Sequence, residues 1–279
     1  MSEEQLNFNY CDELVQAFEE AIDNPIKSKS SVYYTGVDLG TACVVVAVLD
    51  ENLRPVAGAY RWADVVRDGM VVDYIGAVQI VRELKQEVEE KLGTELIHAA
   101  AAIPPGTDTL DGGAVKNVVQ GAGFELTGLF DESTAANAVL KIKSGAVVDI
   151  GGGTTGISIF KDGELIHVDD EPTGGTHFSL VVSGAYKMEF SEADVFKRNP
   201  DNHAELLPVL RPVMEKVSSI ISGHIAPHDV KAIALVGGTC CLTGIEDVIG
   251  KKTGIYTHKP KNPMFVTPLG IALNCKVED

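Results

Sequence analysis

The sequence is poor in cysteine and in aromatic residues. Its 279 residues include five Cys, one Trp and 6% aromatics. The cysteines are odd in number and form no Cys-x-x-Cys pair, which excludes a disulfide framework and a cysteine-rich metal site. Reduced thiols are typical of the cytoplasm, where we expect this protein. No apolar run approaches the length of a transmembrane helix, and the acidic N-terminus lacks the apolar stretch of a signal peptide.

Basic residues are also scarce. Lys and Arg together number 23 against 40 Asp and Glu, a formal net charge of −17. A surface of this charge repels nucleic acid and anionic membranes, so we expect neither as a partner. Hydrophobic residues make up 45% of the chain, which excludes a disordered protein. Segments of helical and strand character alternate, and this alternation predicts an α/β fold.

The most informative stretch is residues 147–156, in which an apolar run leads into Asp149, three glycines and two threonines. We interpret it as a β-hairpin with a tip made almost entirely of backbone. Glycine permits positive φ and lets backbone N–H groups approach a bound anion. A carboxylate at the end of the strand suits Mg²⁺, which usually keeps its waters and takes one or two carboxylates. The hairpin therefore predicts a phosphate loop beside a metal site.

Three other stretches add to this signal. Residues 35–42 repeat the design of strand, aspartate, glycine and threonine, which suggests two similar halves. Residues 174–176 open a helix with two glycines, either as an anion site or as a plain helix start. Residues 235–239 place Gly-Gly between a strand and a helix, where a flat base or sugar can lie against backbone. Alone, each of these would be an ordinary turn.

Taken in order, the motifs resemble those of the actin/Hsp70/sugar-kinase ATPase superfamily. Its first phosphate motif corresponds to residues 36–41 and its second to residues 149–155. Its first connecting helix corresponds to residues 131–138 and its second to residues 268–272. Its adenosine motif corresponds to residues 235–239. The resemblance spans residues 32–275. Within the superfamily, the chain resembles the ethanolamine-utilisation branch in particular. The stretches that carry this resemblance are residues 62–69, 103–108 and 174–180.

The resemblance implies a fold and a division of the chain. We expect an α/β protein with two ribonuclease-H-like lobes, the actin/Hsp70 ATPase fold, around a central nucleotide cleft. Residues 1–31 would be an N-terminal amphipathic helix and linker, and residues 32–142 the first lobe. Residues 143–279 would be the second lobe, with a small accessory subdomain formed by residues 191–222 and a C-terminal helix that crosses back to the first lobe.

Periodicity predicts individual elements. In the N-terminal segment, Leu14, Phe18 and Ile22 share one helical face, which either packs on the body or docks a partner. We favour packing. The other expected helices include residues 75–92, 132–142, 174–186, 241–249 and 264–275, and the expected strands include 32–37, 96–103 and 164–168.

The resemblance also implies ATP or ADP with Mg²⁺ as ligands and assigns roles to residues. Asp38 and Asp149 would hold Mg²⁺ through waters. The phosphates would be cradled by Gly40, Thr41, Gly151, Gly152, Gly153 and Thr154, with further donors from Gly174 and Gly175. The adenosine would be held by Gly237, Gly238 and Thr239. Glu132, together with Asp149, is the catalytic candidate, because a carboxylate must orient the attacking water. A glutamate in a first helical turn also stabilises the helix dipole, so both roles stay open.

The implied function is a slowly hydrolysing, Mg-ATP-dependent switch or chaperone-like protein. Its clients would be ethanolamine-utilisation enzymes or components of the bacterial microcompartment, with which it would associate in the cytoplasm. Two alternatives remain. A small-molecule kinase needs an acid to deprotonate the acceptor, and no such motif stands out. A polymerising actin-like protein needs complementary surfaces at opposite ends, which a sequence does not display.

Overall fold

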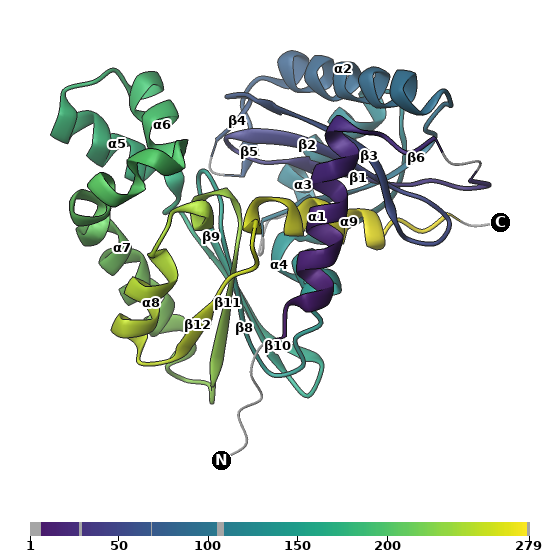
Figure 1. The fold of residues 1–279 in the computed structure, drawn as a ribbon. Coiled ribbons are helices and arrows are strands. Elements are labelled where there is room, and N and C mark those ends of the chain that lie inside the picture. The colour runs from purple at the N-terminus through teal and green to yellow at the C-terminus, as the bar shows by residue number, and fades with distance from the viewer. Residues whose placement is uncertain (1–6, 28–29, 68, 105–108, 278–279) are drawn as a thin grey trace. The chain divides into compact units, whose positions relative to one another are not determined.

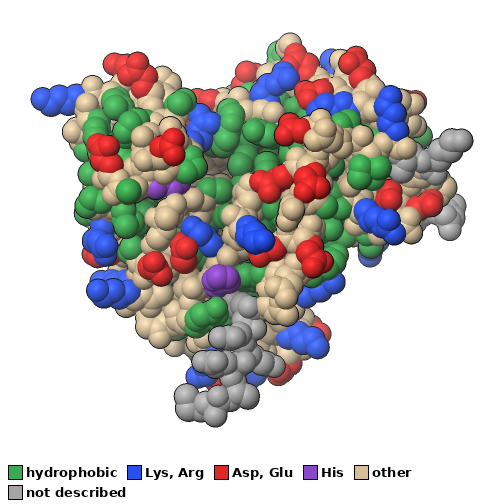
Figure 2. All heavy atoms as spheres, viewed as in Figure 1, with side chains coloured by type: hydrophobic (Ala, Val, Ile, Leu, Met, Phe, Trp, Pro, Cys, Tyr) green, Lys and Arg blue, Asp and Glu red, His purple; other side chains and the backbone are tan. Residues whose placement is uncertain are grey.

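The computed structural model describes residues 7–27, 30–67, 69–104 and 109–277. The chain divides into two compact units. One comprises Phe8–Lys141 with Phe265–Asp279, and we refer to it as the 8–141 unit. The other comprises Ile142–Met264 with Met1–Asn7, and we refer to it as the 142–264 unit. On the face shown in Figure 2, acidic and basic side chains are interspersed, so the negative charge forms no single patch there.

The 8–141 unit contains a five-stranded sheet of order β3-β2-β1-β6-β7. Its strands are β1 (Tyr34–Leu39), β2 (Cys43–Leu49), β3 (Pro55–Trp62), β6 (His98–Ile103) and β7 (Glu125–Asp131). The β1–β2 and β2–β3 pairs are antiparallel, whereas β1–β6 and β6–β7 are parallel. A small ribbon pairs β4 (Val66–Arg67) with β5 (Met70–Val71). β2 is apolar along its whole length because helices cover both faces of the sheet.

Helices lie on both faces of this sheet (Figure 1). One face carries α2 (Tyr74–Leu92) and α3 (Thr109–Gly121), which share the main core of the unit. The other face carries α4 (Glu132–Leu140) and α9 (Val266–Leu273). The alanines of β6 explain how helices fit closely on both faces of the sheet. Ala99 and Ala101 face the α2–α3 core, whereas Ala100 and Ala102 face α4 and α9. Their small side chains let helix backbone come close to the sheet.

α9 is packed especially tightly. A methyl group at Gly36 of β1 would stand 2.5 Å from the Ala272 amide nitrogen and the Pro268 carbonyl oxygen. A methyl group at Gly270 would collide with the Ala135 carbonyl oxygen of α4. Glycine is therefore required at both places by close backbone approach. The helix predicted at residues 132–142 is α4, and it packs closely against α9.

α1 (Asn9–Asp23) packs on the body of the 8–141 unit. Its buried face includes Leu14, Val15 and Phe18. The Phe18 ring is completely buried against β3, where Gly58 leaves room for it. The packing interpretation of the N-terminal helix is confirmed. Residues 28 and 29 of the predicted linker lie outside the described residues.

The 142–264 unit has a second five-stranded sheet with the same arrangement of strands. Its order is β10-β9-β8-β11-β12. The strands are β8 (Gly145–Ile150), β9 (Thr155–Lys161), β10 (Glu164–Glu171), β11 (Ala232–Val236) and β12 (Tyr256–His258). The β8–β9 and β9–β10 pairs are antiparallel and the β8–β11 and β11–β12 pairs are parallel. The two similar halves inferred from the repeated aspartate–glycine motif are therefore confirmed.

The helices of this unit are α5 (Gly175–Tyr186), α6 (Phe190–Arg198), α7 (His203–Ile225) and α8 (Ile245–Thr253), with 3-10 turns η1 (Pro200–Asn202), η2 (Gly238–Cys241) and η3 (Pro263–Phe265). Figure 1 shows α7 and α8 against one face of the sheet. An apolar stripe on α7 shares one core with Ile157 and Ile159 of β9. α7 therefore contributes to the core of this unit, and the accessory subdomain expected at residues 191–222 stays a prediction.

Most predicted helices are confirmed within one or two residues, and three boundaries need correction. The helix expected at 241–249 is α8, which starts only at Ile245 because Gly244 adopts φ +84° and residues 238–241 form η2. The final helix is the shorter α9, preceded by η3. The strand expected at 164–168 continues to Glu171, since β10 stays paired with β9 as far as Thr155.

Candidate functional site

The loop between β8 and β9 is the centre of the candidate site. It holds Gly151, Gly152, Gly153 and Thr154, and its ends are joined by a hydrogen bond from the Gly151 N–H to the Thr154 carbonyl at 3.0 Å. Within the described part of the chain, no group accepts a hydrogen bond from the N–H of Gly152 or of Gly153. Successive unpaired backbone N–H groups make an anion-binding concavity. We refer to residues 151–154 as the phosphate loop.

The N-terminus of α5 holds the phosphate loop in place. The Gly175 N–H donates to the Gly151 carbonyl at 2.9 Å, and the Thr176 N–H and hydroxyl donate to the Gly152 carbonyl at 2.7 and 3.0 Å. A methyl group at Gly174 would stand 2.7 Å from the Gly153 carbonyl carbon. The two glycine motifs are thus brought together. The amide of Gly175, predicted as a phosphate donor, is already engaged by the loop itself.

The predicted adenosine motif follows β11, the strand next to β8. The Thr239 hydroxyl donates to the Gly151 carbonyl at 2.7 Å, so this side chain also braces the phosphate loop. Gly237 has φ +91° and donates its N–H to the Pro263 carbonyl at 3.0 Å. Around Gly238, no described heavy atom lies within 4 Å of the position a methyl group would take. The backbone of the motif is therefore open at Gly238, and Thr239 joins the motif to the phosphate loop.

A buried carboxylate and a half-buried one accompany the loop. Asp149, at the end of β8, is 6% exposed. Asp170 of β10 was missed in the sequence because its strand was predicted to end at residue 168. Burial raises the pKa of Asp170 to about 7. A hydrogen bond from Thr154 opposes this shift, and the charges of Asp149, Asp169 and Glu171 add to it. The acidic run at residues 169–171 is the feature of the sequence that could have pointed to Asp170.

These residues fit a divalent cation and a phosphate chain. The Asp170 Oδ1 atom is buried and has no hydrogen-bond partner among the described residues. A carboxylate oxygen left in this way, beside the buried Asp149 carboxylate, suits a hard cation with oxygen ligands or its bound water. The unpaired amides of Gly152 and Gly153 suit phosphate oxygens. Asp149 and Asp170 could hold Mg²⁺, and the phosphate loop could hold the phosphates.

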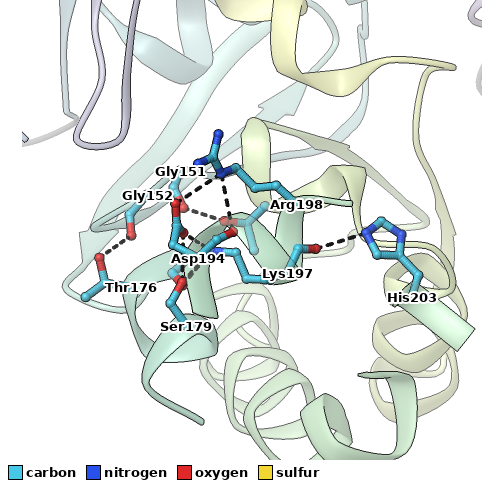
Figure 3. A network of polar contacts seen from close by, with 10 residues as sticks. Gly151, Gly152, Thr176, Ser179, Asp194, Lys197, Arg198 and His203 are labelled. Atoms are coloured by element: carbon cyan, nitrogen blue, oxygen red, sulfur yellow. Dashed lines mark hydrogen bonds and ion pairs between the residues drawn. The ribbon is translucent and has the colours of Figure 1, made fainter. Parts of the chain in front are cut away.

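A polar network behind α5 was not anticipated (Figure 3). The Lys197 ammonium of α6 is buried and donates to Asp194 Oδ1 at 2.9 Å, to the Ser179 hydroxyl at 2.7 Å and to the Gly175 carbonyl at 3.0 Å. Burial lowers the pKa of Lys197, against the opposing effect of Asp194. For Asp194, burial acts to raise the pKa, but Lys197, Ser179 and Arg198 outweigh it and the pKa falls. Lys197 thereby ties α6 to the first residue of α5.

The network continues through His203 at the start of α7. Its Nδ1 accepts a hydrogen bond from the Thr243 N–H at 3.1 Å, which leaves Nε2–H to donate to the Lys197 carbonyl at 3.1 Å. Burial lowers the pKa of His203, in keeping with this neutral ring. A chain of contacts therefore runs from Thr243 through Lys197 to Gly175 and the phosphate loop. Its members are distant in sequence, and their spacing gave no signal.

The remaining predicted site residues belong to the 8–141 unit. Asp38 lies in β1 opposite Val45, as Asp149 lies in β8 opposite Gly156, so the two aspartates hold equivalent positions in the two sheets. Gly40 and Thr41 form the turn that follows β1. Glu132 is the first residue of α4, whose N-cap Asp131 accepts a hydrogen bond from the Thr134 N–H at 2.7 Å. The roles assigned to these four residues stay predictions.

Comparisons with known proteins show which families the chain resembles. The family described as MreB/Mbl protein matches residues 59–191, and the family described as type IV pilus assembly protein PilM matches residues 133–265. The ethanolamine utilization protein EutJ of Salmonella typhimurium is 42% identical over 240 residues, which cover 86% of this chain and 84% of that protein. The chain belongs to the EutJ family.

Solved structures agree with EutJ membership. The crystal structure of EutJ from Carboxydothermus hydrogenoformans matches with a TM-score of 0.89 and 48% identity, covering 94% of this chain and 97% of that one. MreB5 of Spiroplasma citri, solved bound to AMPPNP, matches with a TM-score of 0.66 at 16% identity, covering 88% and 96%. The latter likeness shows the fold alone. The predicted actin/Hsp70-type ATPase fold is confirmed for this EutJ-family chain. No helix among its described residues is long and apolar enough to cross a membrane.

Proposed function

We propose that this EutJ-family protein binds ATP and ADP with Mg²⁺ and acts as a slowly hydrolysing switch on proteins of ethanolamine utilisation. The observation that supports the proposal best is the phosphate loop, with two unpaired amides beside Asp149 and the orphaned carboxylate oxygen of Asp170. The nucleotide-bound MreB5 of the same fold adds support. Cytoplasmic location, association with the microcompartment and a chaperone-like action on its clients belong to the same proposal.

Each part of the site has a role in this function. The amides of Gly152 and Gly153 bind phosphate oxygens, and the backbone of Gly237 and Gly238 lies along the adenosine. Asp149 and Asp170 orient the metal-bound waters. The metal, when bound, neutralises charge that develops on the phosphates. Glu132 remains our candidate for orienting the attacking water. Gly40 and Thr41 remain candidates for phosphate binding, and Asp38 remains a candidate for holding Mg²⁺.

The test is thermal unfolding of the full chain with Mg-ATP, with Mg-ADP and without ligand. A ligand present at about 100 times its Kd adds ~2.7 kcal/mol of stability, which raises Tm clearly. We expect this rise for the wild type and its loss in Asp149→Ala, because the metal loses a ligand. Asp247→Ala, which removes an exposed carboxylate of α8, is the matched control and should keep the rise. Equal Tm for the wild type with and without millimolar nucleotide would refute the proposal.

A further inference from the structure

A cluster of histidine and acidic side chains lies away from the phosphate loop, where β10 meets the C-terminal end of α7. His167 and Asp169 of β10 and His224 of α7 each offer one ligand atom, and these atoms all lie within 4.8 Å of one another. The His224 side chain is 18% exposed and that of Asp169 is 48% exposed. The cluster is therefore partly shielded but reachable from solvent.

The topology explains why these residues meet. β10 is an edge strand of its sheet and pairs with β9, so that His167 lies opposite Ile159 and Asp169 opposite Ile157. Both isoleucines pack in the core that α7 covers. Side chains alternate between the faces of a strand, so the odd-numbered residues of this part of β10 face α7. Asp170 faces the other way, which separates the cluster from the carboxylates of the phosphate loop.

The hydrogen bonds at the cluster leave nitrogen lone pairs for a ligand. The Nε2 atom of His224 lies 2.9 Å from Glu171 Oε1, whereas its Nδ1 atom lies 3.4 Å from Asp169 Oδ2. A carboxylate on one ring nitrogen fixes the tautomer and frees the other nitrogen to coordinate. The Nε2 atom of His167 is buried and has no hydrogen-bond partner among the described residues. A third ring, that of His228, is centred 5.0 Å from the ring of His167.

We propose that His167, Asp169 and His224 form a binding site for a divalent transition-metal ion, with Zn²⁺ as the best match. Imidazole nitrogens combined with a carboxylate oxygen suit Zn²⁺, whereas Mg²⁺ prefers oxygen ligands alone. Three protein ligands leave a fourth position for water or His228. Glu171 orients the His224 ring through its contact with Nε2, the ring nitrogen that does not bind the ion. The ion ties the edge strand β10 to the end of α7 and is separate from the Mg²⁺ of the proposed nucleotide site.

The test is isothermal titration of metal-free full-length protein with Zn²⁺ at neutral pH, with Cys241→Ser as the background because Cys241 is an exposed thiol. We expect one equivalent to bind and to raise Tm by at least about 5 °C at saturation. His167→Ala and His224→Ala should each weaken binding by more than about 100-fold. Glu171→Gln should weaken it by ~10–100-fold, the usual effect of losing a partner of a metal-binding histidine.

The matched control is His98→Ala, which removes a histidine that also lies beside a carboxylate, with Nδ1 3.6 Å from Glu125 Oε2. It should bind Zn²⁺ as the background does, and so should Asp149→Ala, which separates this proposal from the nucleotide site. Circular dichroism of the metal-free variants checks that they fold, and His224→Gln serves if His224→Ala does not. Absence of saturable binding, or binding unchanged in folded His167 and His224 variants, would overturn the proposal and leave a cluster of histidine–carboxylate pairs without a metal.

Discussion

Replacing Lys197 with methionine is expected to destabilise the 142–264 unit by about 3–5 kcal/mol, the usual cost of breaking a buried ion pair. Methionine keeps most of the volume of lysine but removes the donor bonded to Gly175 and Ser179. It also removes one of the two positive charges that balance Asp194, the other being Arg198. We expect a fall in Tm of about 10 °C in thermal unfolding of the full chain. Because Gly175 in turn holds the phosphate loop, nucleotide affinity should also fall.

The matched control is Lys251→Met, which removes an exposed lysine from the last turn of α8 and should change stability by less than about 0.5 kcal/mol. The double variant Lys197→Met/Asp194→Leu removes the carboxylate together with the ammonium that it accepts from. Its loss should therefore be smaller than the sum of the two single losses, by ~0.5–3 kcal/mol. If Lys197→Met is as stable as Lys251→Met, the network does not anchor α5.

The sequence was sufficient for features that depend on neighbouring residues. The turn after β8 was predictable from Asp149 and the three glycines that follow it, since glycine permits the tight turns of exposed backbone that end a strand. Its counterpart at Asp38 then predicted two related halves, and the strand orders agree. Helix boundaries with clear caps, such as Asp131 before α4, were also predictable.

Features that depend on distant contacts were not predictable in this way. Lys197 is 22 positions from Gly175, and a lysine in a charged helix is usually solvated, so its burial was not expected. Asp170 was excluded from its strand because acidic residues weaken strand signals, yet pairing with β9 continues past it. His167 and His224 meet only because α7 crosses the sheet beside its edge strand. In each case the decisive partner comes from another element.

Replacing Gly237 with alanine is expected to cost about 3 kcal/mol and to abolish the stabilisation by nucleotide. A residue with a side chain at φ +91° costs roughly 1–2 kcal/mol, and forcing a methyl group into packed structure costs ~1–3 kcal/mol more. The methyl group would collide with Asp149 Oδ1 and stand 2.6 Å from the Ile150 carbonyl oxygen. β8 cannot move away easily, because Val236 and Asp149 are paired in the sheet. Urea unfolding of the full chain measures the loss.

Gly238→Ala is the matched partner of this variant, since it adds the same methyl group one residue later. Its φ is not positive and no described heavy atom lies within 4 Å of the added carbon, so stability should stay within about 0.5 kcal/mol of wild type. If adenosine lies against this backbone, the methyl group occupies its place, and nucleotide affinity should fall at least about 10-fold in a titration. Unchanged affinity in Gly238→Ala would place the adenosine elsewhere, and unchanged stability in Gly237→Ala would contradict the backbone geometry around Asp149. The pair thus separates the fold of the site from its proposed occupant.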